Sequence, residues 1–232
     1  MRLWKLLAGA ALALPFTVGA AIAQQAPVKI RIAWTVPVAN SPTILYEKPD
    51  LLKFKGKSYD IELVYFQGTP PMMTALSSGD IALLAYSSLA LSIQNANMTD
   101  LRVIADEAQE GVDGYYTSPF MVLKDGPIKT AADLKGKVVA TNAQGSAVDI
   151  AMKSNLKKAG LEDKRDYSVV EGAFPNMRAL LTQGKADLVS VVAPFSYHPE
   201  MVEKAKTLFT VKDGLGKSQF IVWVAKDGFL QK

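Results

Sequence analysis

The alternation of short apolar strands with single helices constrains the fold of this chain more than any other feature. Residues 28–34 alternate as a half-buried strand does. Residues 70–78 form an expected helix that proline opens and Gly79 ends. Strands separated by single helices predict parallel βαβ units with right-handed crossovers, and hence an α/β fold. The other expected strands are 60–66, 81–86, 101–105, 120–123, 137–141, 167–170, 188–192 and 220–225. One further helix is expected to start with Ser41 as its N-cap, and the others are expected at 87–95, 130–133, 146–159, 175–183 and 198–205.

The first 23 residues have the plan of a secretory signal peptide. Arg2 and Lys5 form a positive head, residues 6–16 form an uncharged run, and residues 21–23 form a small-x-small cleavage site. The run is too short to cross a hydrocarbon layer of about 30 Å, which disfavours the alternative of a retained membrane anchor. We therefore expect export to a periplasm, with cleavage after Ala23.

Composition excludes several kinds of site. The chain has no cysteine, which rules out disulfides, thiolate metal sites, iron–sulfur clusters and thiol catalysis. His198 is its only histidine, so we expect neither a metal site nor a serine–histidine triad. The formal net charge of +4 is too weak to favour nucleic-acid binding. We expect no cofactor.

A shift of 105 positions aligns one helix–strand unit with another. Two explanations remain open: an internal repeat, or two ordinary units that obey the same capping rules. Either one predicts two α/β lobes, joined by a crossover near 111–118, with a ligand cleft between them at the carboxyl ends of the strands. The aligned pairs are Pro70 and Pro175, Met72 and Met177, Leu76 and Leu181, Gly79 and Gly184, and Leu83 and Leu188.

Five stretches carry a family resemblance: residues 66–71, 78–82, 123–130, 133–140 and 145–146. Through them the chain resembles the solute-binding proteins of ABC importers in the nitrate/sulfonate/taurine family. The resemblance implies a two-lobed type II periplasmic-binding-protein fold with a hinge between the lobes. It also implies a monomer that captures a small, usually anionic solute (a sulfonate, nitrate or taurine-like compound) and delivers it to a membrane permease.

Such proteins normally continue beyond the strand that returns to lobe 1. The resemblance therefore implies that the C-terminal part of lobe 1 is missing; the alternative is an unusually short complete protein. We expect a signal peptide at 1–23, lobe 1 at 24–115, lobe 2 at 116–213 and a return crossing to lobe 1 at 214–232.

The loops that follow the expected strands form the candidate pocket. They are rich in hydroxyls, amides and aromatic rings, and they hold no Lys or Arg, so helix N-termini would bind an anion there, or the loops a neutral polar solute. We expect the loop from Asn142 to Ser146 to make the main polar contact of lobe 2, unless Ser146 only caps its own helix. Glu171 either accepts a ligand ammonium or is solvated or paired with a lysine. The candidate ligand-binding residues are Trp34, Asn40, Ser41, Gly68, Thr69, Tyr86, Ser87, Ser88, Asn142, Gly145, Ser146, Glu171, Pro194 and Phe195, of which the aromatic ones are either pocket walls or lobe packing.

Two other functions stay open from the sequence. One is an enzyme similar to the pyrimidine synthases of thiamine biosynthesis, which share the fold but use a cysteine-rich segment that this chain lacks. The other is a ligand-sensing module for a membrane receptor. No nucleophile–base pair or carboxylate dyad is recognisable, so we expect no catalytic residues and no enzymatic activity.

Overall fold

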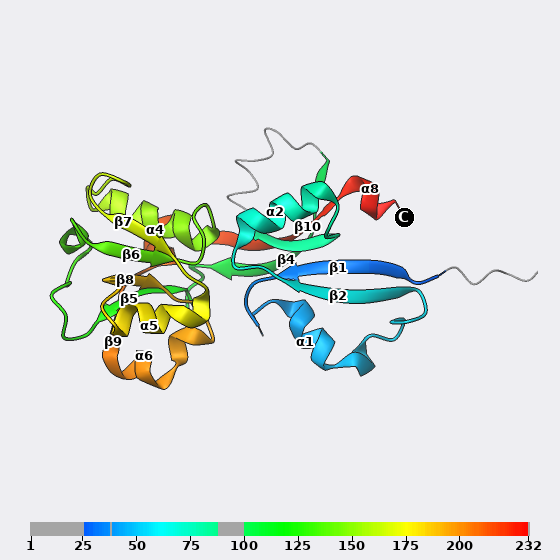
Figure 1. Ribbon diagram of the computed structural model, residues 1–232, viewed down its shortest axis with the longest axis horizontal. Coiled ribbons are helices and arrows are strands. Elements are labelled where there is room, and N and C mark those ends of the chain that lie inside the picture. Colours follow the sequence, from blue (N-terminus) through cyan, green and yellow to red (C-terminus); the bar gives the residue numbers. More distant parts are fainter. Residues whose placement is uncertain (1–25, 38, 88–99, 232) are drawn as a thin grey trace, which may run out of the picture.

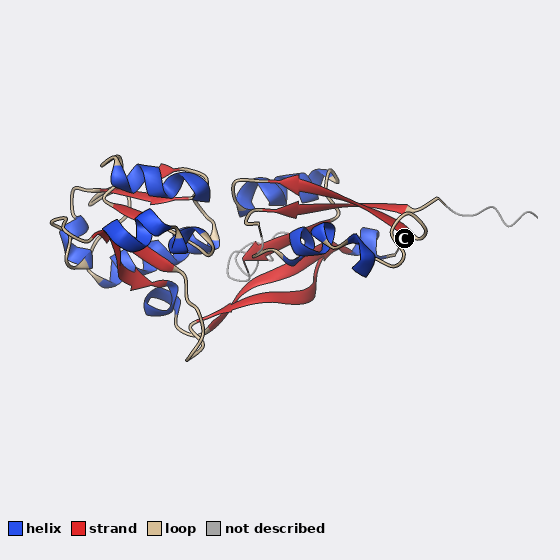
Figure 2. Ribbon diagram, turned by 90° about the horizontal axis from the view of Figure 1, so that it is seen from below, coloured by secondary structure: helices blue, strands red, loops and turns tan. Residues whose placement is uncertain are grey.

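The computed structural model describes residues 26–37, 39–87 and 100–231. It has two lobes, each built on a five-stranded sheet, with two long strands crossing between them (Figures 1 and 2). The lobe 1 sheet has the strand order β2-β1-β3-β10-β4 and the lobe 2 sheet the order β7-β6-β8-β5-β9. The lobe 1 strands are β1 (Val28–Trp34), β2 (Tyr59–Tyr65), β3 (Leu83–Ser87), β4 (Leu101–Glu110) and β10 (Ser218–Lys226), and those of lobe 2 are β5 (Pro119–Leu123), β6 (Val138–Thr141), β7 (Ser168–Glu171), β8 (Leu188–Ser190) and β9 (Ala205–Thr210).

Both sheets are mixed: each contains the expected parallel pairs and also an antiparallel strand that the local pattern did not indicate. The second strand in each order pairs in parallel with both of its neighbours: β1 with β2 and β3, and β6 with β7 and β8. The fourth strand in each order, β10 or β5, is antiparallel to both of its neighbours. β10 runs the other way because it returns from lobe 2, and a local pattern of helix and strand cannot show the direction of a strand.

Helices cover the sheets at the expected places, with small shifts at their ends. α1 begins with Asn40 as its N-cap, one residue before the expected Ser41, and Pro42 lies in its first turn. The expected helix at 87–95 lies outside the described residues except for Ser87, which ends β3. The helices are α1 (Ser41–Glu47), α2 (Thr69–Ser78), α4 (Ala147–Lys158), α5 (Met177–Thr182), α6 (Pro199–Lys204), α7 (Val211–Leu215) and α8 (Asp227–Leu230), with single 3₁₀ turns η1 (Pro49–Leu51), η2 (Ala131–Leu134), η3 (Phe174–Asn176) and η4 (Phe195–Tyr197). No helix within the described ranges is long and apolar enough to cross a membrane.

The aligned helix–strand units occupy equivalent places in the two lobes. Met72 in α2 and Met177 in α5 are both fully buried, and each helix precedes the third strand of its sheet order. Gly79 and Gly184 follow these helices with φ of 84° and 69°. Since the two sheets also share one strand order, the structure favours the internal repeat over a coincidence of capping rules.

Lobe 2 has the larger core of the two. α4 buries seven of its residues, Leu156 among them, whereas α1 buries none. α2 packs on one face of the lobe 1 sheet, against Ala33 and Leu84, and the opposite face has a small cluster around Ile32 and Trp223.

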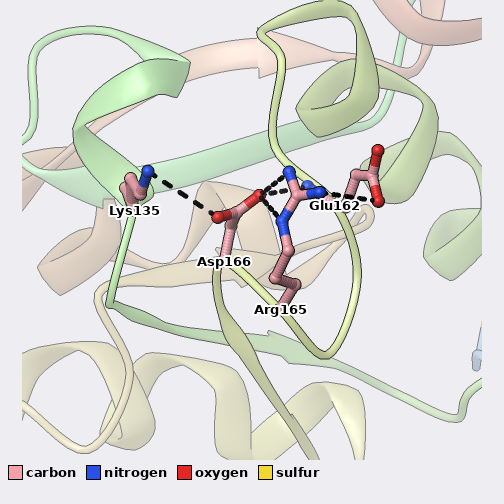
Figure 3. A network of polar contacts seen from close by, with 4 residues as sticks. All are labelled: Lys135, Glu162, Arg165 and Asp166. Atoms are coloured by element: carbon pink, nitrogen blue, oxygen red, sulfur yellow. Dashed lines mark hydrogen bonds and ion pairs between the residues drawn. The ribbon is translucent and has the colours of Figure 1, made fainter.

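A network of polar contacts stabilises the segment of lobe 2 that precedes β7 (Figure 3). Asp166, only 7% exposed, accepts hydrogen bonds from the Arg165 guanidinium at 2.7 and 3.1 Å and from the Glu162 amide at 2.9 Å. Lys135 lies 3.8 Å from its other oxygen, and Arg165 also pairs with the Glu162 carboxylate. The hydrogen bonds from Arg165 and from the Glu162 amide lower the pKa of the Asp166 carboxyl below its ordinary value.

The crossing segments touch each other where the chain leaves lobe 1. A Cβ on Gly111 would lie 2.6 Å from the carbonyl oxygen of Gly216, and both glycines have positive φ, 75° and 73°. Only glycine allows this approach of two backbones without strain. The two segments that connect the lobes therefore lie side by side at Gly111 and Gly216. Two glycines at this place suit a hinge, because glycine allows large changes of backbone angle.

Candidate functional site

A cavity of about 230 Å³ lies between the lobes. Its walls come from three sources: loops of lobe 1, loops of lobe 2 and the crossing strands. The volume lies just below the usual range of about 300–1,000 Å³ for drug-sized ligands, so the cavity suits a small solute. The lining residues are Thr35, Val36, Ala39, Asn40, Thr69 and Ala85 from lobe 1, Glu107–Glu110, Tyr116, Ser118, Phe220 and Ile221 from the crossing segments, and Asn142, Ser146–Val148, Phe174, Val192 and Ala193 from lobe 2.

Two helices begin at the cavity, one from each lobe. α2 starts at Thr69, and its N-cap, Gly68, offers no side chain to cap it. The Thr69 hydroxyl is buried and has no hydrogen-bond partner. α4 starts after Ser146, whose hydroxyl accepts from the Asp149 amide and donates to the Asn142 side chain at 2.7 Å. The first amides of a helix have no partner within it and are partly positive, so both starts can hold polar groups of a solute.

The two helix starts differ in charge. The first turn of α4 holds the buried Asp149, which accepts from the Gly145 amide at 2.8 Å and pairs with Lys153 at 3.1 Å. Burial raises the pKa of the Asp149 carboxyl. The first turn of α2 holds no acidic residue. The α2 start therefore has the more positive surroundings of the two.

The lobes touch each other beside the cavity. The side-chain amide of Gln67 donates to the Asn142 carbonyl at 2.8 Å, and the side-chain amide of Asn142 donates to the Gln67 carbonyl at 3.0 Å. Next to this pair, Gly68 lies so close to lobe 2 that a Cβ on it would be 2.5 Å from the Ala143 Cβ. The two lobes are therefore in direct contact on this side of the cavity, and we call this arrangement closed.

Four of the candidate residues line the cavity: Asn40, Thr69, Asn142 and Ser146. The Asn40 carboxamide oxygen accepts from the Thr35 and Val36 amides at 2.9 and 2.8 Å. This closes the loop after β1 and aims the Asn40 amide group at Glu107, 3.2 Å away.

The remaining candidates lie elsewhere. The Trp34 ring packs edge-on against Tyr65, with 5.1 Å between ring centroids, and the half-buried Phe195 packs on the lobe 2 core. The exposed Glu171 accepts from the Gln144 amide, and Ser41 donates its amide to Glu107. Six more positions complete the set. Gly68 and Gly145 stand at the contact between the lobes, with Gly145 at a φ of 79°, and Pro194 is exposed. Tyr86 and Ser87 contribute backbone to β3, and Ser88 lies outside the described residues.

Sequence reasoning missed the contribution of the crossing strand β4. Residues 107–110 all line the cavity, although the expected strand ended at residue 105. The available signal was the group of three carboxylates, Asp106, Glu107 and Glu110, directly after the expected strand. The loop 111–118 was expected only to connect the lobes, yet it supplies Tyr116 and Ser118 to the cavity wall.

Residues 54–229, most of the chain, match the model of the NMT1/THI5 like family. The chain belongs to the NMT1/THI5-like family. A relative from Escherichia coli (strain K12), named for binding aliphatic sulfonates, is 26% identical over 179 residues, which are 76% of this chain and 53% of that protein. This NMT1/THI5-like chain thus spans about half the length of the curated relative that it matches.

Solved structures show the same fold. The alkanesulfonate-binding protein SsuA of Xanthomonas axonopodis pv. citri matches with a TM-score of 0.69 and 24% identity, over 89% of this chain and 70% of that one. The periplasmic nitrate-binding protein NrtA of Synechocystis PCC 6803 matches with a TM-score of 0.67 and 12% identity, over 88% of this chain and 57% of that one. This NMT1/THI5-like chain has the two-sheet α/β fold of periplasmic binding proteins, and these relatives are named as binding proteins.

Proposed function

We propose that this chain binds a small polar solute between its lobes and delivers it to the membrane permease of an ABC importer. One observation carries the proposal: the cavity is lined by both lobes and by the crossing strands, while the lobes touch beside it. A solute enclosed in this way favours the closed arrangement, because only that arrangement offers all of its walls at once. The sulfonate- and nitrate-binding names of the relatives support an anionic group on the solute.

Among the sequence candidates, we assign solute contact to the cavity-lining residues Asn40, Thr69, Asn142 and Ser146. The Thr69 hydroxyl and the amides at the start of α2 supply donors for the anionic group. The function is binding without catalysis, since the relatives are named as binding proteins.

The lobes are proposed to comprise 24–115 and 116–213, with 214–232 returning to lobe 1, and the protein to act as a monomer. We also propose that export removes residues 1–23. Mass spectrometry of protein secreted by a Gram-negative host is then expected to find Gln24 as the first residue. Intact Met1 in the membrane fraction would contradict this.

A thermal-shift screen of sulfonates, nitrate, pyrimidines and aromatic acids tests the binding function. A solute at about 100 times its dissociation constant adds roughly 2.7 kcal/mol to the stability of the folded state. The variant Ala39→Trp places a large ring at the exposed rim of the cavity and is expected to abolish the shift. The matched control Ala132→Trp changes an exposed alanine that does not line the cavity, and it is expected to keep the shift. Equal shifts in both variants would place binding elsewhere, and turnover of a bound compound would favour an enzyme.

A further inference from the structure

Two carboxylates line the cavity, both from β4. Glu107 accepts a hydrogen bond from the Asn40 side chain at 3.2 Å and one from the Ser41 amide at 3.1 Å. Glu110, only 4% exposed, accepts from the Ser118 amide and hydroxyl, the latter at 2.6 Å. Each carboxylate is thus fixed in place by neutral donors, and each keeps capacity to accept further hydrogen bonds.

An irregularity in the strand pairing brings both carboxylates to the cavity. Residues three apart on a regular strand point to opposite faces of a sheet. Here Val222 pairs with Asp106 and Ile221 with Ala108, so Glu107 is an extra residue between two successive pairs. A bulge of this kind re-aims the side chains around it. The same stretch of β10 is irregular as well, because Gln219 pairs with Gln109 and leaves Phe220 extra.

No positive side chain balances these carboxylates. Among the described residues, no Lys, Arg or His lines the cavity, and none forms an ion pair with Glu107 or Glu110. The sequence of residues 88–99, outside the described ranges, contains no charged side chain either. Burial raises the pKa of the Glu107 carboxyl, which is the usual sign of a charge that lacks a partner.

Aromatic residues of the cavity lining suit a cation too, and an unpartnered hydroxyl in the lining is separate evidence for a ligand. The aromatic rings of Tyr116, Phe174 and Phe220 line the cavity, and aromatic faces attract cations. The Thr69 hydroxyl also lines it, more than nine-tenths buried and without a hydrogen-bond partner. A buried polar group without a hydrogen-bond partner destabilises the folded state. This hydroxyl is therefore available to form a hydrogen bond with the solute.

We infer, on the basis of the solute-binding function proposed above, that the solute carries a protonated nitrogen, an amine or an amidine, which donates to Glu107 with Glu110 beside it. Its other end accepts a hydrogen bond from the Thr69 hydroxyl at the start of α2. The solute class is therefore a small molecule with a cationic nitrogen at one end and an accepting or anionic group at the other. From the sequence, Glu171 was a possible acceptor for a ligand ammonium, and Glu107 is given that role here.

Matched pairs of compounds test this inference by calorimetry and thermal shift. The pairs are 2-aminoethanesulfonate with ethanesulfonate, 3-aminopropanoate with propanoate, and 4-(aminomethyl)benzoate with 4-methylbenzoate. Within a pair, the amine is expected to bind at least about tenfold more tightly, a difference of about 1.4 kcal/mol. Whichever compound of the wider screen binds most tightly is compared in the same way with its analogue that lacks the nitrogen.

Glu107→Gln is expected to reduce this preference to less than about threefold, because it keeps the shape and removes the charge. Glu203→Gln is the matched control, since Glu203 is exposed on α6 and does not line the cavity. Circular dichroism and the melting temperature without solute establish that each variant is folded, and Glu110→Gln provides a second test if Glu107→Gln is not.

The outcomes separate this inference from the proposed function. Tight binding by compounds without a cationic nitrogen would overturn the inference and leave solute binding intact. A preference for amines that survives in Glu107→Gln, or in Glu110→Gln if that variant replaces it, would also overturn it. Binding by no compound of either set would contradict the proposed function and this inference together.

Discussion

Replacing Gly68 with alanine is expected to open the lobes without damaging either one. The φ of Gly68 is −166°, an extended value that alanine adopts freely, so the substitution puts no strain on the backbone of lobe 1. The new Cβ would, however, lie 2.5 Å from the Ala143 Cβ and 3.0 Å from the Asn142 side-chain nitrogen. Carbon atoms in contact prefer about 3.5–4.0 Å, so the lobes must separate by about 1 Å or more at this point.

The size of the effect follows from the contacts that are lost. Separation breaks both hydrogen bonds between Gln67 and Asn142. Each such bond contributes about 0.5–1.5 kcal/mol, so the closed arrangement loses about 1–3 kcal/mol. That loss disfavours the closed lobes by a factor of roughly 5–150 and weakens solute affinity by up to the same factor.

Spin-label distance measurements can detect this opening, because the natural chain has no cysteine to compete for the label. Cysteines at the exposed positions Lys57 in lobe 1 and Lys185 in lobe 2 report the separation of the lobes. Gly68→Ala is expected to shift the distances to longer values. The control Gly228→Ala, whose Cβ meets no described atom within 4 Å, is expected to leave them unchanged. Unchanged distances and unchanged solute affinity in Gly68→Ala would refute the reasoning.

Three further predictions concern lobe 2. Met177→Ala removes a fully buried side chain and is expected to cost about 2–5 kcal/mol of unfolding free energy in urea, whereas a cost below 1 kcal/mol would mean that the core repacks. Ser146→Ala removes the cap of α4 and is expected to cost about 1 kcal/mol in the same assay, and to weaken solute binding measured by calorimetry; unchanged affinity would limit Ser146 to capping. The pKa of Asp166 is lowered in the folded state, so its contribution to stability is complete above the ordinary aspartate value of about 3.9 and is lost as the pH falls through the folded pKa. The stability deficit of Asp166→Asn is therefore expected to be large at pH 7 and to shrink toward pH 3, and a deficit that does not change with pH would contradict this account.

Much of lobe 2 could be predicted from local signals. The helix from Ala147 to Lys158 lies within one residue of its expected ends, because Ser146 caps it and Gly160 follows it. β9 and α7 were missed, although Thr210 and Asp213 form a capping box of the kind that the sequence displays at Thr130 and Asp133. In lobe 1, the capping residue of α1 was placed one position late, because Asn40 and Ser41 are both good N-caps and only the contacts of Asn40 with the preceding loop distinguish them.

The sequence by itself indicated the two-lobed α/β fold, the approximate positions of most strands and helices, the alignment of one helix–strand unit with another, and four residues of the cavity wall. Periodicity and capping are local properties, so they can be recognised from neighbouring residues alone. Only the tertiary structure decided that β10 runs antiparallel, that Gly68 lies against Ala143, and that a bulge aims Glu107 into the cavity. Each of these features depends on segments far apart in the chain, and the register between such segments is set by packing and leaves no mark on either segment alone.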